Sequence, residues 1–309
     1  MTKRVIVIVG CGGTGGYLIP ALCNYLEVKE RGLKEADRSS LVLIDGDMVE
    51  AKNLERQYFS EDDIGENKAI SFEKRIAEAE LSANVFAYDR YLETPEELKA
   101  IADSYKGEKI FVGCVDNMHA RNVIKRTFHM YDDAVYIDGG NEFKNGQCVY
   151  AAKNSGVIIS PDYSFYFVEN LEGEKSRTQM SCTELNSVSP QHVLANRVSA
   201  ELILHGIVQL YEGVTPRGMS LFDLAKGFSV KYETPEEYGF KIEESVGEYI
   251  NTRTLEEKLD LIKDGKFLDY FSKQEDSRIR EAVVSFIKEK NNGENNEKEQ
   301  PQQQLEAVM

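Results

Sequence analysis

Hydrophobic positions in the first 140 residues alternate between short apolar runs and longer amphipathic segments. An unbroken run of β-branched and other apolar residues is typical of a strand that is covered on both faces of a sheet. The amphipathic segments carry apolar residues at helical spacing and predict helices. The predicted strands are residues 5–9, 41–44, 85–88, 109–115 and 135–138.

Helix signals fill the intervals between these runs. Thr94 is followed by Pro95, Glu96 and Glu97, and a proline at the first helical position with acids in the first turn is a helix start. Further helices are predicted over residues 14–28, 67–80, 117–130 and 192–211. Strands that alternate with helices at this spacing predict an α/β fold with a doubly wound, mostly parallel, Rossmann-like sheet.

The pattern weakens in the second half of the chain. Residues 154–180 have little periodicity and several aromatic side chains, so we interpret them as a segment that crosses over the sheet. Short helices and loops are expected over 215–285, and the polar composition of 290–304 predicts disorder. The expected organisation is a sheet domain over 1–213, a mainly helical C-terminal appendage over 214–288 and a disordered tail over 289–309.

Composition excludes some classes of partner and some cellular compartments. Of the 309 residues, 41% are hydrophobic and 29% charged, and 37 basic against 53 acidic residues give a net charge of −16. This balance disfavours nucleic acid and anionic membranes as partners. No apolar run approaches the roughly 20 residues of a membrane span, and the N-terminus does not resemble a secretory signal.

The five cysteines predict a reducing environment, because their number is odd and their spacing irregular. We therefore expect a cytoplasmic protein. No Cys-x-x-Cys pair is present, so no four-thiolate zinc site is expected. The four histidines lack the spacing of a metal site, and no role is assigned to them.

A glycine-rich turn follows the first predicted strand. Gly10, Gly12, Gly13 and Gly15 allow the backbone to turn tightly and approach a ligand closely. The helix that follows directs its N–H groups and the positive end of its dipole at that ligand, and phosphate suits such a position. By itself this pattern is shared by every dinucleotide-binding fold, and a tight strand-to-helix turn is the ordinary alternative.

The second predicted strand ends in Asp45, whose carboxylate is placed to accept hydrogen bonds from ribose hydroxyls. A nicotinamide-binding fold has its acid about 20 residues after the glycines, whereas Asp45 comes 35 residues after Gly10. It is followed by Asp47, Glu50, Asn53, Arg56 and Gln57, and the Asn-x-x-Arg-Gln cluster among them suits an enzyme that must neutralise a triphosphate. An NAD-dependent oxidoreductase remains an alternative, but it has no use for this cluster.

Four motifs in this order carry a resemblance to a known family: GCGGTGG at 10–16, DGDMVEAKNLERQ at 45–57, GENKA at 65–69 and CVDN at 114–117. Over residues 3–213 the chain resembles the ThiF/MoeB adenylyltransferases, which are relatives of the ubiquitin-activating enzymes. The resemblance implies an antiparallel half of the sheet, to which residues 147–152 would contribute a strand. It also implies an ATP- and Mg²⁺-dependent reaction that converts the C-terminal carboxylate of a substrate into an acyl-adenylate.

The resemblance implies a nucleotide site made by the glycine turn, with Asp45 on the ribose and Asn53 and Arg56 on the phosphates. It adds the other polar residues of the motifs to this site: Asp47, Gln57, Lys68, Asp116 and Asn117. Arg56, Lys68 and Asp116 are the expected catalytic residues among these. Each also has an ordinary explanation as a surface group, a turn or a helix cap.

Two positions have support from local physics as well. Lys68 lies near a helix N-terminus, which disfavours a cation unless an anion faces it, so we interpret it as a phosphate-binding lysine. Asp116 follows a predicted strand directly, where open α/β sheets bind ligands, and Mg²⁺ commonly takes one or two carboxylates plus phosphate oxygens. Asp116 is therefore the predicted magnesium ligand, with an N-cap as the alternative.

Cys182 lies where relatives carry a nucleophilic cysteine and is a candidate to accept the activated acyl group. A free thiol has a pKa near ~8.5 and needs a nearby cation or helix dipole to ionise, and burial as an ordinary core residue is the alternative. The implied partners are a ubiquitin-like or sulfur-carrier protein or a peptide, and a second copy of the chain in a homodimer. A nucleotide-binding scaffold without catalysis stays open as a different class of function.

Overall fold

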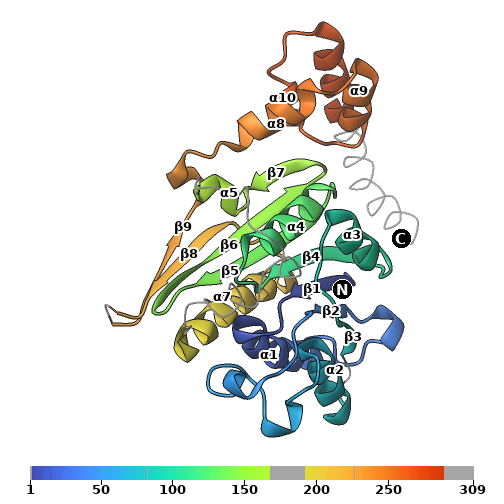
Figure 1. The fold of residues 1–309 in the computed structure, drawn as a ribbon. Coiled ribbons are helices and arrows are strands. Elements are labelled where there is room, and N and C mark those ends of the chain that lie inside the picture. The colour runs from blue at the N-terminus through green and yellow to red at the C-terminus, as the bar shows by residue number, and fades with distance from the viewer. Residues whose placement is uncertain (1, 82, 168–191, 226, 289–309) are drawn as a thin grey trace, which may run out of the picture. The chain divides into compact units, whose positions relative to one another are not determined.

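The computed structural model describes residues 2–81, 83–167, 192–225 and 227–288 (Figure 1). The chain divides into two compact units, Met1–Phe240 and Lys241–Met309. The first unit runs past the boundary that we predict after Gly213. Cys182 and the predicted tail lie outside the described residues.

The described strands of the first unit form one sheet. They are β1 (Arg4–Val9), β2 (Ser40–Ile44), β3 (Asn84–Tyr88), β4 (Glu108–Gly113), β5 (Ala134–Asn141), β6 (Asn145–Asn154), β7 (Val157–Ser160), β8 (Gly218–Asp223) and β9 (Ser229–Glu233). Their order is β3-β2-β1-β4-β5-β6-β8-β9, with β7 paired to β6. The pairs from β3 to β5 are parallel, and those from β5 to β9 are antiparallel. The predicted Rossmann-like α/β sheet with an added antiparallel portion is confirmed, and the antiparallel portion has as many strand pairs as the parallel one.

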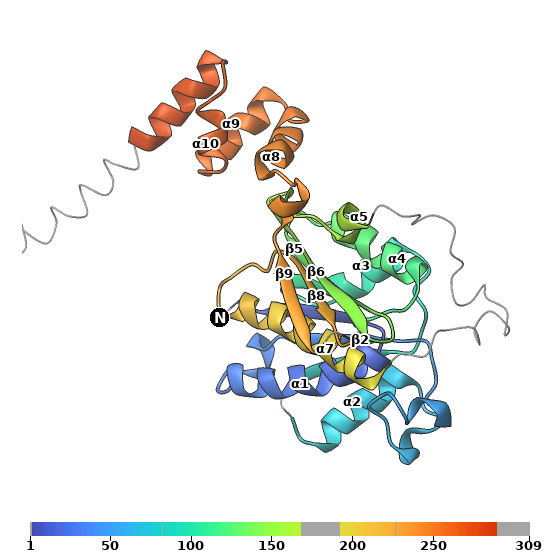
Figure 2. The same ribbon diagram turned by 90° about the vertical axis from the view of Figure 1, so that its left-hand side faces the viewer.

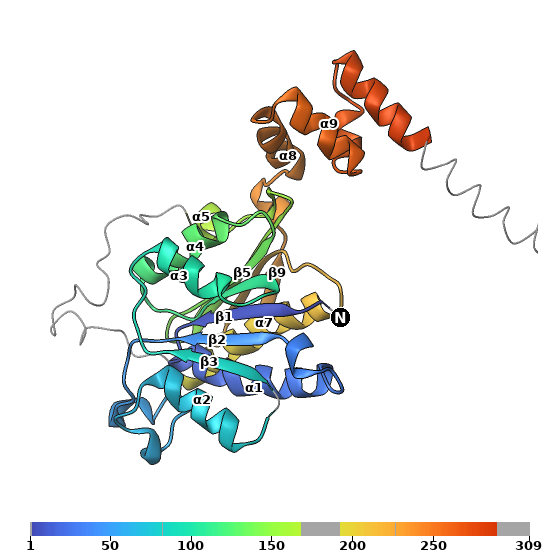
Figure 3. The same ribbon diagram turned by 90° about the vertical axis from the view of Figure 1, so that its right-hand side faces the viewer.

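Helices cover both faces of this sheet (Figures 2 and 3). They are α1 (Gly13–Lys29), α2 (Lys68–Glu78), α3 (Pro95–Asp103), α4 (Met118–His129), α5 (Tyr163–Tyr166) and α7 (Val193–Tyr211). One core packs alternate strand residues such as Ile6 and Ile8 against α1, α2 and α7. The other packs their neighbours, such as Val5 and Val7, against α3, α4 and α5. This two-sided burial explains the unbroken apolar runs in the central strands, Val5–Val9 of β1 and Leu41–Ile44 of β2.

Local sequence explains where the helices begin. Asn67 caps α2 by accepting from the N–H groups of Ala69 and Ile70, Thr94 caps α3, and Asn117 caps α4. Asparagine and threonine are preferred at these positions because their side-chain oxygen accepts an otherwise unpaired N–H. Between β2 and α2 the chain forms two short 3₁₀ turns, η2 (Ala51–Asn53) and η3 (Glu61–Asp63).

Two predictions about the second half need correction. Residues 154–180 contain the strand β7 and the short helix α5, so this segment is not wholly irregular where it is described. Residues 215–285 contain β8 and β9, which we did not predict. β8 pairs with β6, and β9 pairs with β8. In β9 even the apolar residues Val230 and Tyr232 are exposed, so this strand has no continuous apolar run that would have predicted it.

The second unit is helical where it is described, as predicted for this part of the chain. Its helices include α8 (Ile242–Asn251), α9 (Leu255–Lys263) and α10 (Leu268–Phe271), and residues 277–288 form a further helix. A small core of its own joins them, with Ile250, Ile262 and Phe271 at its centre. Thr254 and Glu257 form a capping box that starts α9.

Candidate functional site

The order of the strands identifies one point on the sheet as the natural place for a ligand. From β1 the chain adds β2 and β3 on one side and then returns to add β4 and β5 on the other. Open α/β sheets bind ligands at such a switch point, outside the carboxyl ends of the strands. Val9 pairs with Ile44 of β2 and with Gly113 of β4, so the carboxyl ends of these strands lie level with one another.

The glycine turn begins at this point and depends on two of its glycines. Gly10 has φ +95°, and a Cβ there would lie 2.5 Å from the carbonyl oxygen of Cys114, at the end of β4. A Cβ on Gly15 would lie 1.9 Å from the carbonyl oxygen of Gly10. The turn therefore packs tightly against its own helix and against the end of β4. At either position, a residue with a side chain would clash with the backbone.

The N-terminus of α1 is left open for an anion. No side chain of the described residues caps it, and no acidic residue lies in its first turn. The first N–H groups of a helix have no partner within the helix and carry the positive end of its dipole. A phosphate is the group that such an end binds most readily.

Asp45 holds the glycine turn in place. One of its carboxylate oxygens accepts from the backbone N–H of Cys11 at 2.7 Å, and the other accepts from the N–H of Asp47 at 2.8 Å. Burial raises the pKa of Asp45, and the nearby Lys68 cation opposes that shift. Both oxygens thus have structural partners, although each keeps a further lone pair for a ribose hydroxyl.

Lys68 forms an ion pair with Asp47, with 2.9 Å between Nζ and Oδ2, and only 7% of the lysine side chain is exposed. Tyr91 donates to the other oxygen of Asp47. The side chain of Asn67 donates to the carbonyls of Asp45 and Asp47 at 2.8 and 3.1 Å. The start of α2 is therefore fastened to the end of β2, and its buried lysine is held beside Asp45.

The loop after β2 carries three further predicted residues. Asn53 is buried, and its side-chain oxygen accepts from the N–H of Glu50 at 2.9 Å, so it shapes the loop. Gln57 lies against Gly12, and its buried Oε1 has no hydrogen-bond partner among the described residues. The backbone carbonyl of Arg56 accepts from the side chain of Asn196 at 3.4 Å, which brings this residue to the start of α7.

Asp116 and Asn117 follow β4 at the same edge. Asp116 is exposed, and Asn117 uses its side-chain oxygen to accept from the N–H of Ala120 at 2.8 Å as the N-cap of α4. Among the described residues, no group of three or more His, Cys, Asp or Glu side chains could hold a metal ion. A Mg²⁺ that arrives with a nucleotide needs only one or two protein carboxylates, and the exposed Asp116 fits that requirement.

A buried ion pair behind Asp116 was not predicted. Arg121 of α4 lies 3.3 Å from Asp138 of β5, and it donates to the carbonyls of Val115 and Gly139, each at 3.2 Å. Burial raises the pKa of Asp138, and Arg121 opposes that shift. The pair ties the ends of β4 and β5 together. Its signal in the sequence was an acid at the end of a predicted strand, the same feature that identified Asp45.

A second unpredicted residue is Asn196, in the first turn of α7. Its side chain is fully buried and bonds to Asn141 at the end of β5 as well as to the carbonyl of Arg56. An asparagine in the first turn of a mostly apolar helix was the available signal. Its partners, which are more than 50 residues away in the chain, could not be read from the sequence.

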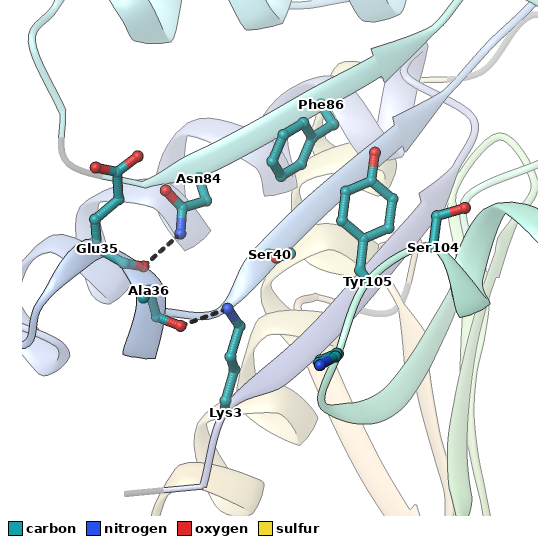
Figure 4. Close-up of a pocket in the computed structure, with 9 residues that line it drawn as sticks. Lys3, Glu35, Ala36, Ser40, Asn84, Phe86, Ser104 and Tyr105 are labelled. Atoms are coloured by element: carbon teal, nitrogen blue, oxygen red, sulfur yellow. Dashed lines mark hydrogen bonds between the residues drawn. The ribbon is translucent and has the colours of Figure 1, made fainter.

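The opposite edge of the sheet carries a hollow of about 550 Å³ at the amino ends of β1, β2 and β3 (Figure 4). Phe86 and Tyr105 pack together within it, with 4.6 Å between ring centroids. Two polar side chains of the hollow are bonded to backbone: Lys3 donates to the carbonyl of Ala36, and Asn84 to that of Glu35. The hollow lies away from the glycine turn.

Among the described residues, no helix has the length and apolar character of a membrane span.

The strand order and the glycine turn define an α/β protein with an open helix N-terminus at the β1–β4 switch point of its sheet. Comparison with protein families identifies it further, because the ThiF family matches residues 1–231. The chain belongs to the ThiF family, as the four motifs predict. No curated protein matches it.

Solved structures share the fold. Escherichia coli MccB with ATP is 17% identical with a TM-score of 0.53, and the match covers 75% of this chain and 63% of that one. The microcin C7 biosynthetic enzyme MccB in complex with N-formylated MccA is 19% identical (TM-score 0.55; 75% and 64% covered). PaaA is 16% identical (TM-score 0.51; 75% and 64% covered). The chain thus spans less than two thirds of the length of these relatives.

Proposed function

We propose that the protein is an ATP-dependent adenylyltransferase that activates the C-terminal carboxylate of a peptide or protein. A carboxylate oxygen of the substrate attacks the α-phosphorus of ATP, a new P–O bond forms, and the bond to the leaving pyrophosphate breaks. The products are an acyl-adenylate and pyrophosphate. Because the reactants are both anions, the protein must place them close together and stabilise the charge that moves onto the pyrophosphate.

One observation carries this proposal: the uncapped glycine turn lies at the carboxyl ends of the strands together with the cationic side chain of Lys68 and the loop that carries Arg56. Lys68 is held by Asp47 at the end of β2, and the backbone of Arg56 is bonded to Asn196 at the start of α7. With the guanidinium of Arg56 directed at the same place, Lys68, Arg56 and the open helix N-terminus would supply more positive charge than an NAD pyrophosphate requires, and they would suit the three phosphates of ATP.

Each residue of the candidate site has a proposed role in binding ATP or in stabilising the leaving group. The turn from Gly10 to Gly15 would pass its N–H groups along a phosphate, and Asp45 would bind the ribose. Arg56 and Lys68 would contact the phosphates and stabilise the leaving group. The remaining polar residues of the motifs would complete the nucleotide site: Asp47, Asn53, Gln57 and Asn117.

Asp116 is the residue that would hold a magnesium ion, since its carboxylate is exposed at the carboxyl end of β4. A bound Mg²⁺ would neutralise phosphate charge. The chain's own task is then to keep that carboxylate directed at the nucleotide, which the N-cap of α4 and the bond from Arg121 to Val115 support.

A peptide is supported as the substrate by the relative MccB, which was solved in complex with N-formylated MccA. A ubiquitin-like or sulfur-carrier protein is the other substrate that the family resemblance implies. Transfer of the acyl group to Cys182, a homodimer and a cytoplasmic location belong to the same proposal.

The test is exchange of labelled pyrophosphate into ATP, with Mg²⁺ and candidate peptides or diglycine-ended proteins as substrates. Asp116→Ala is the inactive variant, and Asp37→Ala is the matched control, because Asp37 is an exposed aspartate in η1 (Glu35–Asp37), near the amino ends of the strands. Exchange that requires one candidate and is lost only in Asp116→Ala would support adenylation and identify the substrate.

Calorimetry separates the alternatives. Binding of ATP without exchange for any candidate would favour a nucleotide-binding scaffold. Binding of NAD in preference to ATP would favour an oxidoreductase. Absence of both exchange and ATP binding would overturn the proposed function.

A further inference from the structure

Asn196 connects three parts of the nucleotide site through one fully buried amide. Its Oδ1 accepts from the side chain of Asn141 at 3.0 Å, and its Nδ2 donates to the carbonyl of Arg56 at 3.4 Å. Asn141 in turn accepts from the hydroxyl of Thr14, in the first turn of α1, at 3.1 Å. The bonds run in one direction, from Thr14 through both amides to the backbone of Arg56.

The glycine turn is shaped to receive this amide. A Cβ on Gly13 would lie 2.5 Å from Nδ2 of Asn196 and 2.9 Å from its Oδ1. Gly13 therefore lets α7 approach α1 closely at the very residue where the phosphate-binding helix begins. A bulkier side chain at 13 would push the amide away from the carbonyl of Arg56.

We propose that Asn196 is a positioning residue that sets the backbone of Arg56, and through it the guanidinium, against the start of α1. This inference rests on the proposed function, because it concerns the phosphate contacts of Arg56. Asn196 is buried beneath the turn and would not touch the nucleotide itself. Its effect on ATP would pass through Arg56.

Asparagine suits this role because it offers one acceptor and one donor on a short stem. An aspartate would keep the acceptor for Asn141 but would face the Arg56 carbonyl with a second acceptor. Leucine or alanine would leave the carbonyl of Arg56 without this bond. The loop that carries Arg56 lacks a regular strand or helix at that residue, so it has few other means of holding the guanidinium in one place.

The experiment is a double-mutant cycle between Asn196 and Arg56, with ATP affinity measured by calorimetry on the full chain. Asn196→Ala should weaken ATP binding about tenfold in the native background, the factor expected for roughly 1.4 kcal/mol of lost interaction. In the Arg56→Ala background the same change should cost less than about twofold, because no guanidinium remains to be positioned.

Asn84→Ala is the control. Its side chain also donates to a backbone carbonyl, that of Glu35 at 3.0 Å, but it lies at the amino-end hollow. It should leave ATP affinity unchanged. Should Asn196→Ala not fold, Asn141→Ala tests the same chain of bonds from a partly exposed residue, and it should show the same dependence on Arg56 with a smaller loss.

A loss of affinity of equal size in both backgrounds would overturn the inference, since Asn196 would then act on the structure in general. Unchanged affinity in Asn196→Ala would overturn it as well. The native chain is measured first, so that failure of the native chain to bind ATP is identified as failure of the proposed function and not of the positioning role.

Discussion

The two ends of the parallel strands are built differently. At the carboxyl ends, the helix N-terminus of α1 is uncapped, Gln57 keeps a buried oxygen without a partner among the described residues, and Lys68 is held close to Asp45. At the amino ends, buried polar groups bond to one another. Glu30 accepts from the N–H and the hydroxyl of Ser39 and from the hydroxyl of Tyr211.

Arg4 completes the amino-end cluster. Its guanidinium lies 4.3 Å from the ring centroid of Tyr211 and donates to the carbonyl of Leu210 at 2.9 Å. This cluster ties β1, α1 and α7 together. Its one buried nitrogen without a hydrogen bond among the described residues, Arg4 Nε, lies 3.4 Å from the carboxylate of Glu108. The difference teaches that polar groups in one fold can serve either a ligand or stability. Changes at the carboxyl ends should therefore affect nucleotide binding, and changes at the amino ends should affect unfolding.

The largest effect is expected from Gly15→Ala. The new methyl group would lie 1.9 Å from the carbonyl oxygen of Gly10, which cannot move without opening the turn. We expect loss of measurable ATP binding and a loss of stability of several kcal/mol, on the order of 3 or more. Calorimetry and urea unfolding measure the two. Gly16→Ala is the matched control on the same helix, because its φ is not left-handed and a Cβ there would meet its nearest neighbours at 3.5 Å, an ordinary van der Waals contact. Native behaviour of Gly15→Ala would refute the tight packing of the turn.

Lys68→Ala should be next in size, with its main effect on activity. Because the lysine is buried and paired with Asp47, a loss of stability accompanies the change, and urea unfolding measures that loss separately. We expect the rate of ATP–pyrophosphate exchange to fall by about 10²–10³, the usual cost of removing one group that stabilises developing charge. Lys74→Ala is the matched control, because Lys74 also pairs with an acid, Glu66, but on the exposed side of the same helix. Equal rates in the two variants would show that Lys68 serves only its ion pair with Asp47.

Glu30→Ala should reverse the pattern. It removes the common acceptor of Ser39 and Tyr211 and leaves buried donors without partners. We expect the free energy of unfolding to fall by about 2–4 kcal/mol, with ATP affinity of the folded protein unchanged. Urea unfolding and calorimetry measure the two quantities, and Glu35→Ala provides an exposed glutamate nearby in the chain as the control. A change in ATP affinity would break the division between the two ends.

Much of the candidate site at the carboxyl ends of the strands could be predicted, because its residues lie in short sequence motifs next to predicted strands and helices. The glycines, Asp45 and Lys68 stand out by their positions at the ends of predicted strands and helices, and the structure places all of them at one edge. What could not be predicted depends on pairing across the chain. Asn196 owes its role to partners in β5 and in the Arg56 loop, and β9 owes its existence to β8.

The amino-end cluster was missed for the same reason. Glu30 is one of many acids in the sequence, and nothing local distinguishes it from Glu35. Its burial follows from the way α1 and α7 end beside one another, which is a property of the packed fold. A polar residue that a ligand needs often lies in a motif, whereas one that the core needs is recognised only by its partners.

The smallest predicted effect is a pH dependence of stability on the amino-end side of β5. Asp162 is buried and accepts from the N–H of Ser164 at 2.9 Å, and one of its oxygens lies 2.7 Å from Nε2 of His129. Although burial alone would raise the pKa of Asp162, the bonds from His129 and Ser164 outweigh it and lower that pKa. A carboxyl whose pKa is lower in the folded state stabilises the fold above its ordinary value of about 3.9.

That contribution should disappear as the pH falls from about 4 through the lowered pKa of the folded state. At pH 7 we expect Asp162→Asn to unfold about 1–2 kcal/mol more easily than the native chain, and the gap should narrow steadily below pH 4. Urea unfolding across this range measures it, with Asp37→Asn as an exposed control. ATP affinity at pH 7 should be native in Asp162→Asn, because the carboxyl end of the sheet is not involved. A gap that stays constant down to pH 3 would mean that the stability lost with Asp162 comes from packing and not from its charge.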